Sequence, residues 1–180
     1  DILYRFFKDN QYARKMVEET ISPSMDISIA SNFERLIYDF YSERDSKVCN
    51  DLFSDFPSFS ISLNEDVWQK SKSLFMSARV NDAETLQTMT EVFKNFQYIL
   101  DPHTAVAFKA AQELQGSVDG PIIVLATAHP AKFPKTLETV GLTASNIPKS
   151  LSHVMDKQEF SFSCEADQTA IINYIKEKNL

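Results

Sequence analysis

Two short polar turns carry the side chains of this sequence that are best suited to chemistry. Asp101 and His103 follow one short apolar run, and Thr127, His129 and Lys132 follow another. If the two runs are neighbouring parallel strands, a carboxylate, two imidazoles, a hydroxyl and an ammonium group meet at one edge of a sheet. Ligands of open α/β sheets bind beyond the carboxyl ends of the strands, where helix N-termini offer free N–H groups. This edge is the predicted ligand site.

Structural roles compete with chemical roles at these positions. Asp101 before Pro102 is a common way to open a helix and needs no further function. His129 before Pro130 suits a turn, and Lys132 suits a solvated surface. On residue types alone, the pattern supports an α/β segment with a candidate ligand edge and leaves these alternatives open.

Strands and the helices after them are expected to hold the two turns in place. Residues 98–100 and 121–126 are short apolar runs typical of strands, and the second is expected to be covered on both faces in a parallel sheet. Residues 75–80 are a third candidate strand. After the first run, Asp101 is expected to cap a helix over residues 103–115 that stops at the following glycine.

The remaining helices are predicted from capping residues and from apolar residues spaced three and four apart. Asn81 and Glu84 form a capping box ahead of an expected buried stripe of Leu86, Met89, Phe93 and Phe96. Residues 50–63 match neither period and are expected to be loop. The expected helices cover residues 31–41, 64–75, 81–96, 132–140 and 165–178, the last with Ile171, Ile172 and Ile175 facing inward.

This order of elements predicts the α/β class, with more helices than strands. Most of the sheet would have to come from elsewhere. The chain opens with Asp1 and an apolar stretch rather than with Met, which also indicates a segment of something longer. Its three glycines, at positions 116, 120 and 141, are not spaced like a phosphate-binding loop.

The composition excludes several classes of function. A net charge of −7 and a pI near 5.0 argue against a nucleic-acid-binding face. No apolar run approaches the about 20 residues of a membrane-spanning helix, so no membrane partner is expected. Cys49 and Cys164 lie far apart with no nearby His pair, so neither a metal site nor a disulfide framework is expected. Free cysteines fit a reducing cytoplasm.

Three stretches resemble the signatures of one enzyme family, threonine synthase. They are Ile99–Ala107, Val124–Pro134, and Ser22–Ile27 followed by Ser31–Leu36, and the second is the most specific. The resemblance implies that residues 1–180 form the C-terminal portion of the catalytic region of a longer bacterial or fungal type enzyme. It also implies the fold of fold-type II pyridoxal phosphate enzymes, similar to the tryptophan synthase beta subunit, helix-rich with a few parallel strands.

In this family the cofactor is pyridoxal 5'-phosphate, and the resemblance implies cofactor-binding roles for three residues. Thr127 would hydrogen-bond the pyridine nitrogen, and a neutral hydroxyl need not keep that nitrogen protonated. Asp101 and His103 would flank the ring.

Four further residues are implied on the substrate side. His129 and Lys132 would line the same edge as Thr127. Ser31 and Asn32 would face the substrate, although helix capping is the simplest explanation of both on residue types alone.

The implied activity is that of a carbon–oxygen lyase acting on phosphates, which converts O-phospho-L-homoserine and water into L-threonine and phosphate in the last step of threonine biosynthesis. The family's Schiff-base lysine and its cofactor-phosphate loop are expected upstream of Asp1. No catalytic residue is therefore expected within these residues, since Lys109 and Lys132 are not placed like that lysine. The chain alone is predicted to be inactive without the N-terminal half of the enzyme.

Two alternatives remain. A threonine synthase-like phospholyase would share the scaffold but eliminate phosphate to a keto acid without adding water. A non-catalytic interaction module made from a truncated product would expose an apolar surface and self-associate to cover it.

Overall fold

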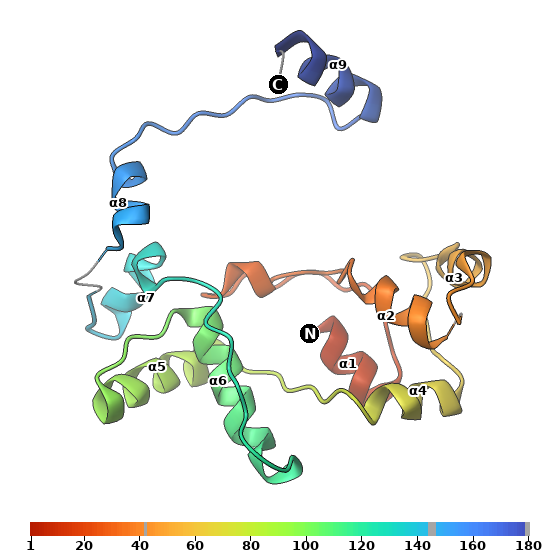
Figure 1. The fold of residues 1–180 in the computed structure, drawn as a ribbon, viewed down its shortest axis with the longest axis horizontal. Helices are drawn as coiled ribbons and strands as arrows, with labels where there is room; N and C mark the ends of the chain where they lie inside the picture. The colour runs from red at the N-terminus through yellow and green to blue at the C-terminus, as the bar shows by residue number, and fades with distance from the viewer. Residues whose placement is uncertain (42, 144–146, 179–180) are drawn as a thin grey trace. The chain divides into compact units, whose positions relative to one another are not determined.

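The computed structural model describes residues 1–41, 43–143 and 147–178 (Figure 1). They divide into two units, Asp1–Ser145 and Asn146–Leu180, and each is described by itself. The first unit contains α1 (Ile2–Asp9), η1 (Pro23–Met25), α2 (Phe33–Phe40), α3 (Ser46–Phe53), α4 (Glu65–Lys72), α5 (Asp82–Phe96), α6 (Pro102–Leu114), η2 (Gln115–Ser117), η3 (Pro130–Lys132) and α7 (Pro134–Thr139), where η denotes a 3₁₀ helix; the second contains α8 (Lys149–Met155) and α9 (Gln168–Lys178).

Aromatic side chains close the core of the first 75 residues. Tyr12 is buried, and its ring stacks on Phe33 at 4.3 Å and on Phe56 at 5.0 Å between ring centroids. Its hydroxyl donates to the Ala30 carbonyl at 3.0 Å and accepts from the Ala30 N–H at 3.1 Å, so the buried polar atom is satisfied. We call this the Tyr12 core; its other buried members are Ile2, Phe6, Ile37, Cys49, Ile61 and Leu63.

A second core lies between α5 and α6, which pack against each other and cross at an angle (Figure 1). The capping box at the start of α5 is confirmed, because Asn81 accepts from the Glu84 N–H and Glu84 accepts from the Asn81 N–H. The buried members of this core are Met89, Val92, Leu100, Ala105, Leu137 and Leu142.

The buried face of α5 differs from the predicted stripe. Thr85 and Thr88 are buried in place of Leu86 and Phe93, which are half-buried, and Phe96 is exposed. The two threonine hydroxyls donate to the carbonyls of residues four positions earlier, so they need no water. The helix is therefore rotated from the orientation that apolar spacing alone indicates.

Most other helix predictions are confirmed within a few residues. Asn64 caps α4 by accepting from the Val67 N–H, and Asp101 caps α6. Residues 50–53 were wrongly predicted as loop, because α3 continues through them after Asp45 caps its start.

No β-strand is present in the part of the chain that the structure describes. Residues 98–100 and 121–126 have no regular hydrogen-bonded ladder, and the only bridge in this part pairs Tyr12 with Ile61. The expectation that residues 121–126 are covered on both faces is wrong in this structure, since Ile123 is 83% and Leu125 70% exposed. A strand forms only against a partner strand, and none of the described residues supplies one.

The second unit leaves its apolar side chains partly open. Ile171, Ile172 and Ile175 of α9 were predicted to face inward, but each is more than 40% exposed. Within the unit, Phe162 contacts the Tyr174 ring at 5.8 Å, and Lys178 lies over both rings. The described residues of this unit therefore do not form a core around α9.

None of the helices in the described ranges is long and apolar enough to cross a membrane. Likewise, these residues contain no group of three or more His, Cys, Asp or Glu side chains that could hold a metal ion. Cys49 is buried and Cys164 is exposed, and both are free thiols.

Candidate functional site

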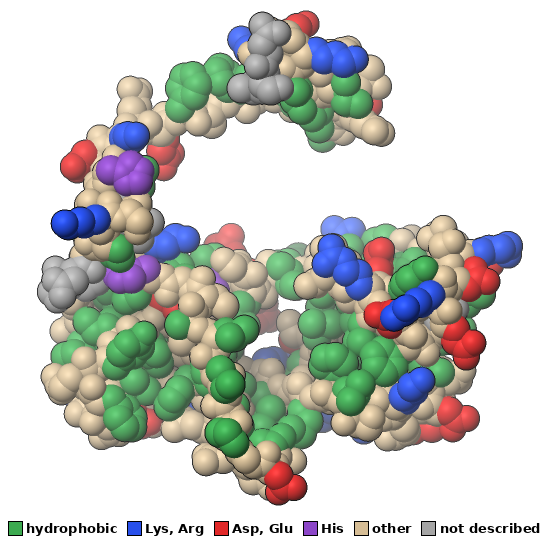
Figure 2. All heavy atoms as spheres, viewed as in Figure 1, with side chains coloured by type: hydrophobic (Ala, Val, Ile, Leu, Met, Phe, Trp, Pro, Cys, Tyr) green, Lys and Arg blue, Asp and Glu red, His purple; other side chains and the backbone are tan. Residues whose placement is uncertain are grey.

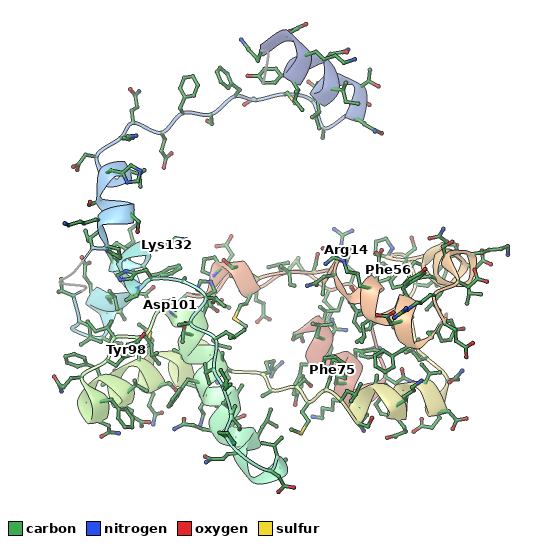
Figure 3. All side chains as sticks on the ribbon, in the orientation of Figure 1. Arg14, Phe56, Phe75, Tyr98, Asp101 and Lys132 are labelled. Carbon is green, nitrogen blue, oxygen red and sulfur yellow. The ribbon has the colours of Figure 1, made fainter. Side chains whose placement is uncertain are left out.

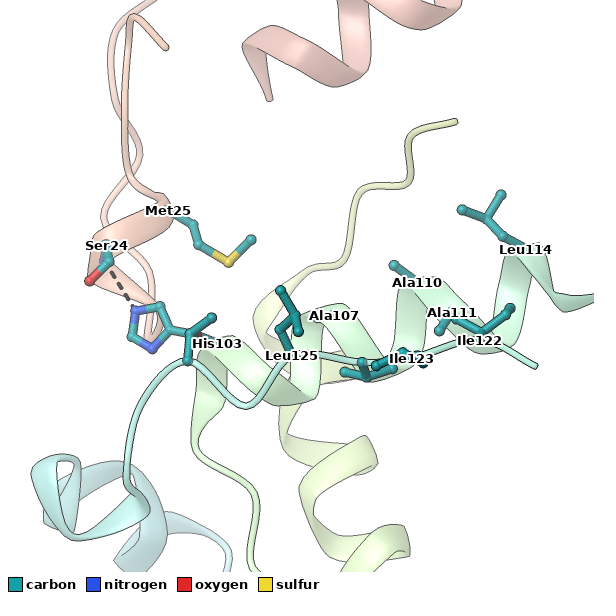
Figure 4. A pocket seen from close by; sticks show the side chains of 12 residues that line it. Ser24, Met25, His103, Ala107, Ala110, Ala111, Leu114, Ile122, Ile123 and Leu125 are labelled. Carbon is teal, nitrogen blue, oxygen red and sulfur yellow. Dashed lines mark hydrogen bonds between the residues drawn. The ribbon is translucent and has the colours of Figure 1, made fainter. Parts of the chain in front are cut away.

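An apolar groove of about 570 Å³ runs along α6 in the first unit (Figure 4). One wall is α6, a second is the extended segment 122–127, and the end beside the start of α6 is bordered by η1. Hydrophobic side chains lie exposed along the extended segment where it crosses α6 (Figure 2). The lining residues are Ser24, Met25, His103, Ala107, Ala110, Ala111, Leu114, Ile122, Ile123, Val124, Leu125 and Thr127.

Polar side chains are few in this groove and lie near one end. Thr127 ends the extended segment, and its hydroxyl has no hydrogen-bond partner among the described residues. The alanines of α6 leave room for a flat group to lie between the helix and the extended segment. A hydroxyl at the end of an apolar slot can hold one polar atom of such a group and fix its orientation.

Asp101 is the buried anchor of this end of the groove. Its extended backbone ends the preceding segment, and its carboxylate caps α6. Oδ1 accepts from the His103 N–H at 3.0 Å and from the Thr104 N–H at 3.4 Å, and Oδ2 accepts from the Thr104 hydroxyl. With every carboxylate contact made to its own helix or to His103, Asp101 is satisfied without a ligand.

His103 connects this anchor to η1. The Ser24 N–H donates to His103 Nε2 at 3.2 Å, across 79 positions of sequence (Figure 4). Since an N–H can only donate, Nε2 must be unprotonated, and the proton of the neutral ring lies on Nδ1. Nδ1 then donates to Asp101 Oδ1 at 3.1 Å. The hydrogen-bond network thus assigns the tautomer.

The three stretches that carry the family resemblance meet at this imidazole. His103 belongs to the Ile99–Ala107 stretch at the start of α6, and Ser24 belongs to the Ser22–Ile27 stretch, within η1. The Val124–Pro134 stretch reaches it through Phe133, whose ring centroid is 4.9 Å from that of His103. Segments far apart in sequence therefore form one end of the groove together.

The structure brings some predicted site residues to the groove and leaves others outside it. Thr127 and His103 line it, with Asp101 behind His103. His129 is half-buried, and its Nδ1 caps η3 by accepting from the Ala131 N–H at 3.1 Å. Lys132 is exposed at the end of η3 (Figure 3). Neither His129 nor Lys132 lines the groove, and their substrate-side roles stay predictions.

Ser31 and Asn32 are exposed at the start of α2 and do not line the groove either. The helix begins at Phe33, and neither side chain makes the expected cap bond. Their substrate-side role also stays a prediction. Lys109, the other lysine considered, pairs with Glu113 on α6 at 3.5 Å and is not a lining residue.

Sequence reasoning assigned no role to Ser24, Met25 or the small side chains of α6. The signal for the first two was present, because both lie within the Ser22–Ile27 stretch. What no local pattern shows is that a backbone N–H of that stretch binds the His103 ring.

Pyridoxal phosphate is the cofactor that the resemblance implies, and the groove suits its ring but not its phosphate. Apolar walls and a terminal hydroxyl match a flat heterocycle with one basic nitrogen. No lining residue is a glycine, lysine or arginine, so these groove residues offer no phosphate cradle. The described residues therefore fit a site for the ring alone.

Comparisons with known proteins agree with the motifs. Residues 104–175 match the family model described as threonine synthase, C-terminal. A threonine synthase of Pseudomonas aeruginosa is 38% identical over 161 residues, which are 88% of this chain and 34% of that protein.

Solved structures show the same similarity. The crystal structure of PLP-bound threonine synthase from Brucella melitensis matches 98% of this chain and 38% of its own, with a TM-score of 0.81 and 33% identity. The yeast threonine synthase structure matches 99% and 40%, with a TM-score of 0.79 and 30% identity. The class of protein that this fold defines is therefore a larger enzyme, of which these residues correspond to one part.

The particular enzyme that the chain resembles is threonine synthase, and the resemblance to its C-terminal portion is confirmed along nearly the whole chain. The chain spans between a third and two fifths of the length of these relatives.

Proposed function

We propose that these residues form the C-terminal part of a threonine synthase that converts O-phospho-L-homoserine and water into L-threonine and phosphate. The observation that supports this most directly is the meeting of Thr127 and His103 in one apolar groove, built from the three motif stretches. In this proposal the groove holds the ring of pyridoxal 5'-phosphate. The binding site for the cofactor's phosphate and the Schiff-base lysine would be provided by the part of the enzyme that corresponds to the rest of the relatives' length.

The chain's own residues would orient and enclose the ring. Thr127 would donate a hydrogen bond to the pyridine nitrogen as a neutral partner, while Ala107, Ala110 and the 122–125 segment would exclude water from the ring faces. When bound, the cofactor supplies the electron sink for loss of phosphate and addition of water. Asp101 would act behind the site by holding His103.

Thr127 provides the test, with a matched pair of substitutions. Thr127→Val removes the hydroxyl at similar volume, whereas Thr127→Ser keeps it. In the complete protein, Thr127→Val is expected to weaken pyridoxal phosphate binding by about three- to tenfold, the value of one neutral hydrogen bond. Thr127→Ser is expected to bind within about twofold of the unaltered protein.

The absorption spectrum of the bound cofactor, before and after addition of O-phospho-L-homoserine, provides the readout. Product analysis then separates the proposed reaction from its runner-up, since a threonine synthase releases L-threonine and phosphate, whereas a phospholyase releases a keto acid. Equal affinity and equal spectra for the two Thr127 variants would contradict the role given to the hydroxyl.

A further inference from the structure

His103 has no free ring nitrogen with which to move a proton. Nδ1 donates to Asp101 and Nε2 accepts from the Ser24 N–H, and the side chain is only 8% exposed. A general acid or base must reach a substrate atom with a proton or a lone pair. The ring can contribute to the groove only through its carbon atoms unless one of these two bonds breaks.

The loop of residues 20–26, which binds His103 through Ser24, is closed by the carboxylate of Asp26. Asp26 accepts from the Thr20 N–H at 2.8 Å and from the Thr20 hydroxyl at 2.7 Å. The Thr20 hydroxyl also bonds the buried Ser22 side chain at 3.1 Å. Residues 20–26 are therefore a closed loop. The Ser24 N–H binds this loop to α6 through His103, and the Ile21 N–H binds it to α5 through Asp82 at 3.4 Å.

Met25 lies beside the Ser24–His103 hydrogen bond and extends along the groove toward α6 (Figure 4). Its side chain is 46% exposed and has no hydrogen bond of its own to fix it. Its position depends on the backbone of the loop. Of the two hydrogen bonds that hold the loop, the one from Ser24 is adjacent to Met25, so its loss is expected to shift Met25 relative to Ala107.

We propose that His103 is a positioning residue, a neutral imidazole that ties the 20–26 loop to α6 and so sets the position of Met25 over the groove. In this assignment His103 does not bind the cofactor through a hydrogen bond. It acts by positioning the loop. It deepens the proposed function and rests on it only where it takes the groove to be the cofactor site.

Two substitutions separate the bonds of the ring. His103→Gln places a carbonyl oxygen near the Nε2 position, where it can accept from the Ser24 N–H. His103→Asn places an amide near the Nδ1 position, where it can donate to Asp101 but cannot reach Ser24. If only the bond to Asp101 mattered, the Asn variant would behave more like the unaltered protein. If the bond from Ser24 positions the loop, the Gln variant is expected to behave more like the unaltered protein.

Hydrogen exchange of peptides covering residues 20–30 tests this in the complete protein with pyridoxal phosphate present. His103→Asn is expected to raise the exchange rate of this loop by about tenfold, and His103→Gln by less than about threefold. The same order is expected for KM, with the larger increase in the Asn variant. Equal exchange in the two variants, or faster exchange in the Gln variant, would overturn the proposal.

A second measurement needs no variant and remains decisive if both substitutions prevent folding. In the protein with ¹⁵N-labelled histidine, the nitrogen resonances of His103 are expected to report a neutral ring with its proton on Nδ1. A proton on Nε2, or on both nitrogens at neutral pH, would overturn the proposal. Exchange and tautomer are measurable whether or not the cofactor binds, whereas the spectrum of bound pyridoxal phosphate tests the proposed function separately.

Discussion

The apolar side chains of the Tyr12 core are covered by other residues of the described chain, whereas those of residues 121–126 along the groove are mostly uncovered. In the core, Phe6 is fully buried and Tyr12 is 1% exposed; in the groove wall, Ile123 and Leu125 are mostly exposed. Both regions are rich in apolar side chains, so composition does not distinguish them. Apolar surface that meets matching surface within the chain becomes core, and the remainder is available to a ligand or to another part of the protein.

The largest effect is expected from removing the centre of the core. Tyr12→Ala deletes a ring that stacks on Phe33 and Phe56, and we expect the free energy of unfolding of this region to fall by about 3–5 kcal/mol. The chain's single tryptophan, Trp68, packs against this core and donates to the Phe6 carbonyl at 2.8 Å. Its fluorescence in a urea titration therefore reports on this region.

Tyr12→Phe is the matched control, since it keeps both stacked rings and removes only the hydroxyl that bonds Ala30. Its loss is expected to be about 1 kcal/mol. Equal losses for the two variants would mean that the hydroxyl, rather than ring packing, holds the core together.

A smaller loss is expected at the anchor of the groove. Asp101→Ala removes the cap of α6 and the partner of His103, and we expect a loss of about 2 kcal/mol in the stability of α6. Hydrogen exchange across α6 measures it, while the Trp68 transition is expected to stay in place. Asp101→Asn keeps an oxygen for the N–H donors and is expected to lose less than half as much. A shift of the Trp68 transition by Asp101→Ala would show that the two regions unfold together.

The same residues show which features of the structure the sequence could predict and which it could not. Asp101 and Asn81 were predicted correctly because a cap binds N–H groups two or three positions away, and such a signal is local. The stacking of Tyr12 on Phe33, and the bond from Ser24 to His103, join residues distant in sequence, which no spacing rule reports. The expected strands are not confirmed for a related reason, since strand pairing depends on a neighbouring strand and not on the apolar run itself.

Alkaline pH should weaken the core and leave the groove wall unaffected. Burial is the main cause that raises the pKa of Tyr12 above its ordinary value of 10.0; the hydrogen bond to Ala30 opposes this shift, and the charge of Glu34 adds to it. The unfolded chain releases this proton more readily, so stability is complete below about pH 10 and falls as the pH rises through the folded-state pKa. Burial raises the pKa of the Cys49 thiol with the same sign.

Trp68 fluorescence in urea, repeated from pH 8 to pH 11, measures this dependence. Tyr12→Phe is expected to flatten it and to leave the contribution of Cys49. An unchanged slope in Tyr12→Phe would assign the pH dependence to other groups.

The smallest change in the free energy of unfolding is expected in the groove wall, and it tests the comparison between the groove and the Tyr12 core. Ile37 and Ile123 are the same residue type, 1% and 83% exposed. In the 180-residue chain, Ile37→Ala is expected to lower the free energy of unfolding by about 2–5 kcal/mol, and Ile123→Ala by less than about 0.5 kcal/mol. Urea unfolding followed by circular dichroism measures both. A loss at Ile123 comparable with that at Ile37 would mean that residues 121–126 are covered in solution, and its dependence on protein concentration would show whether a second copy of the chain provides the cover.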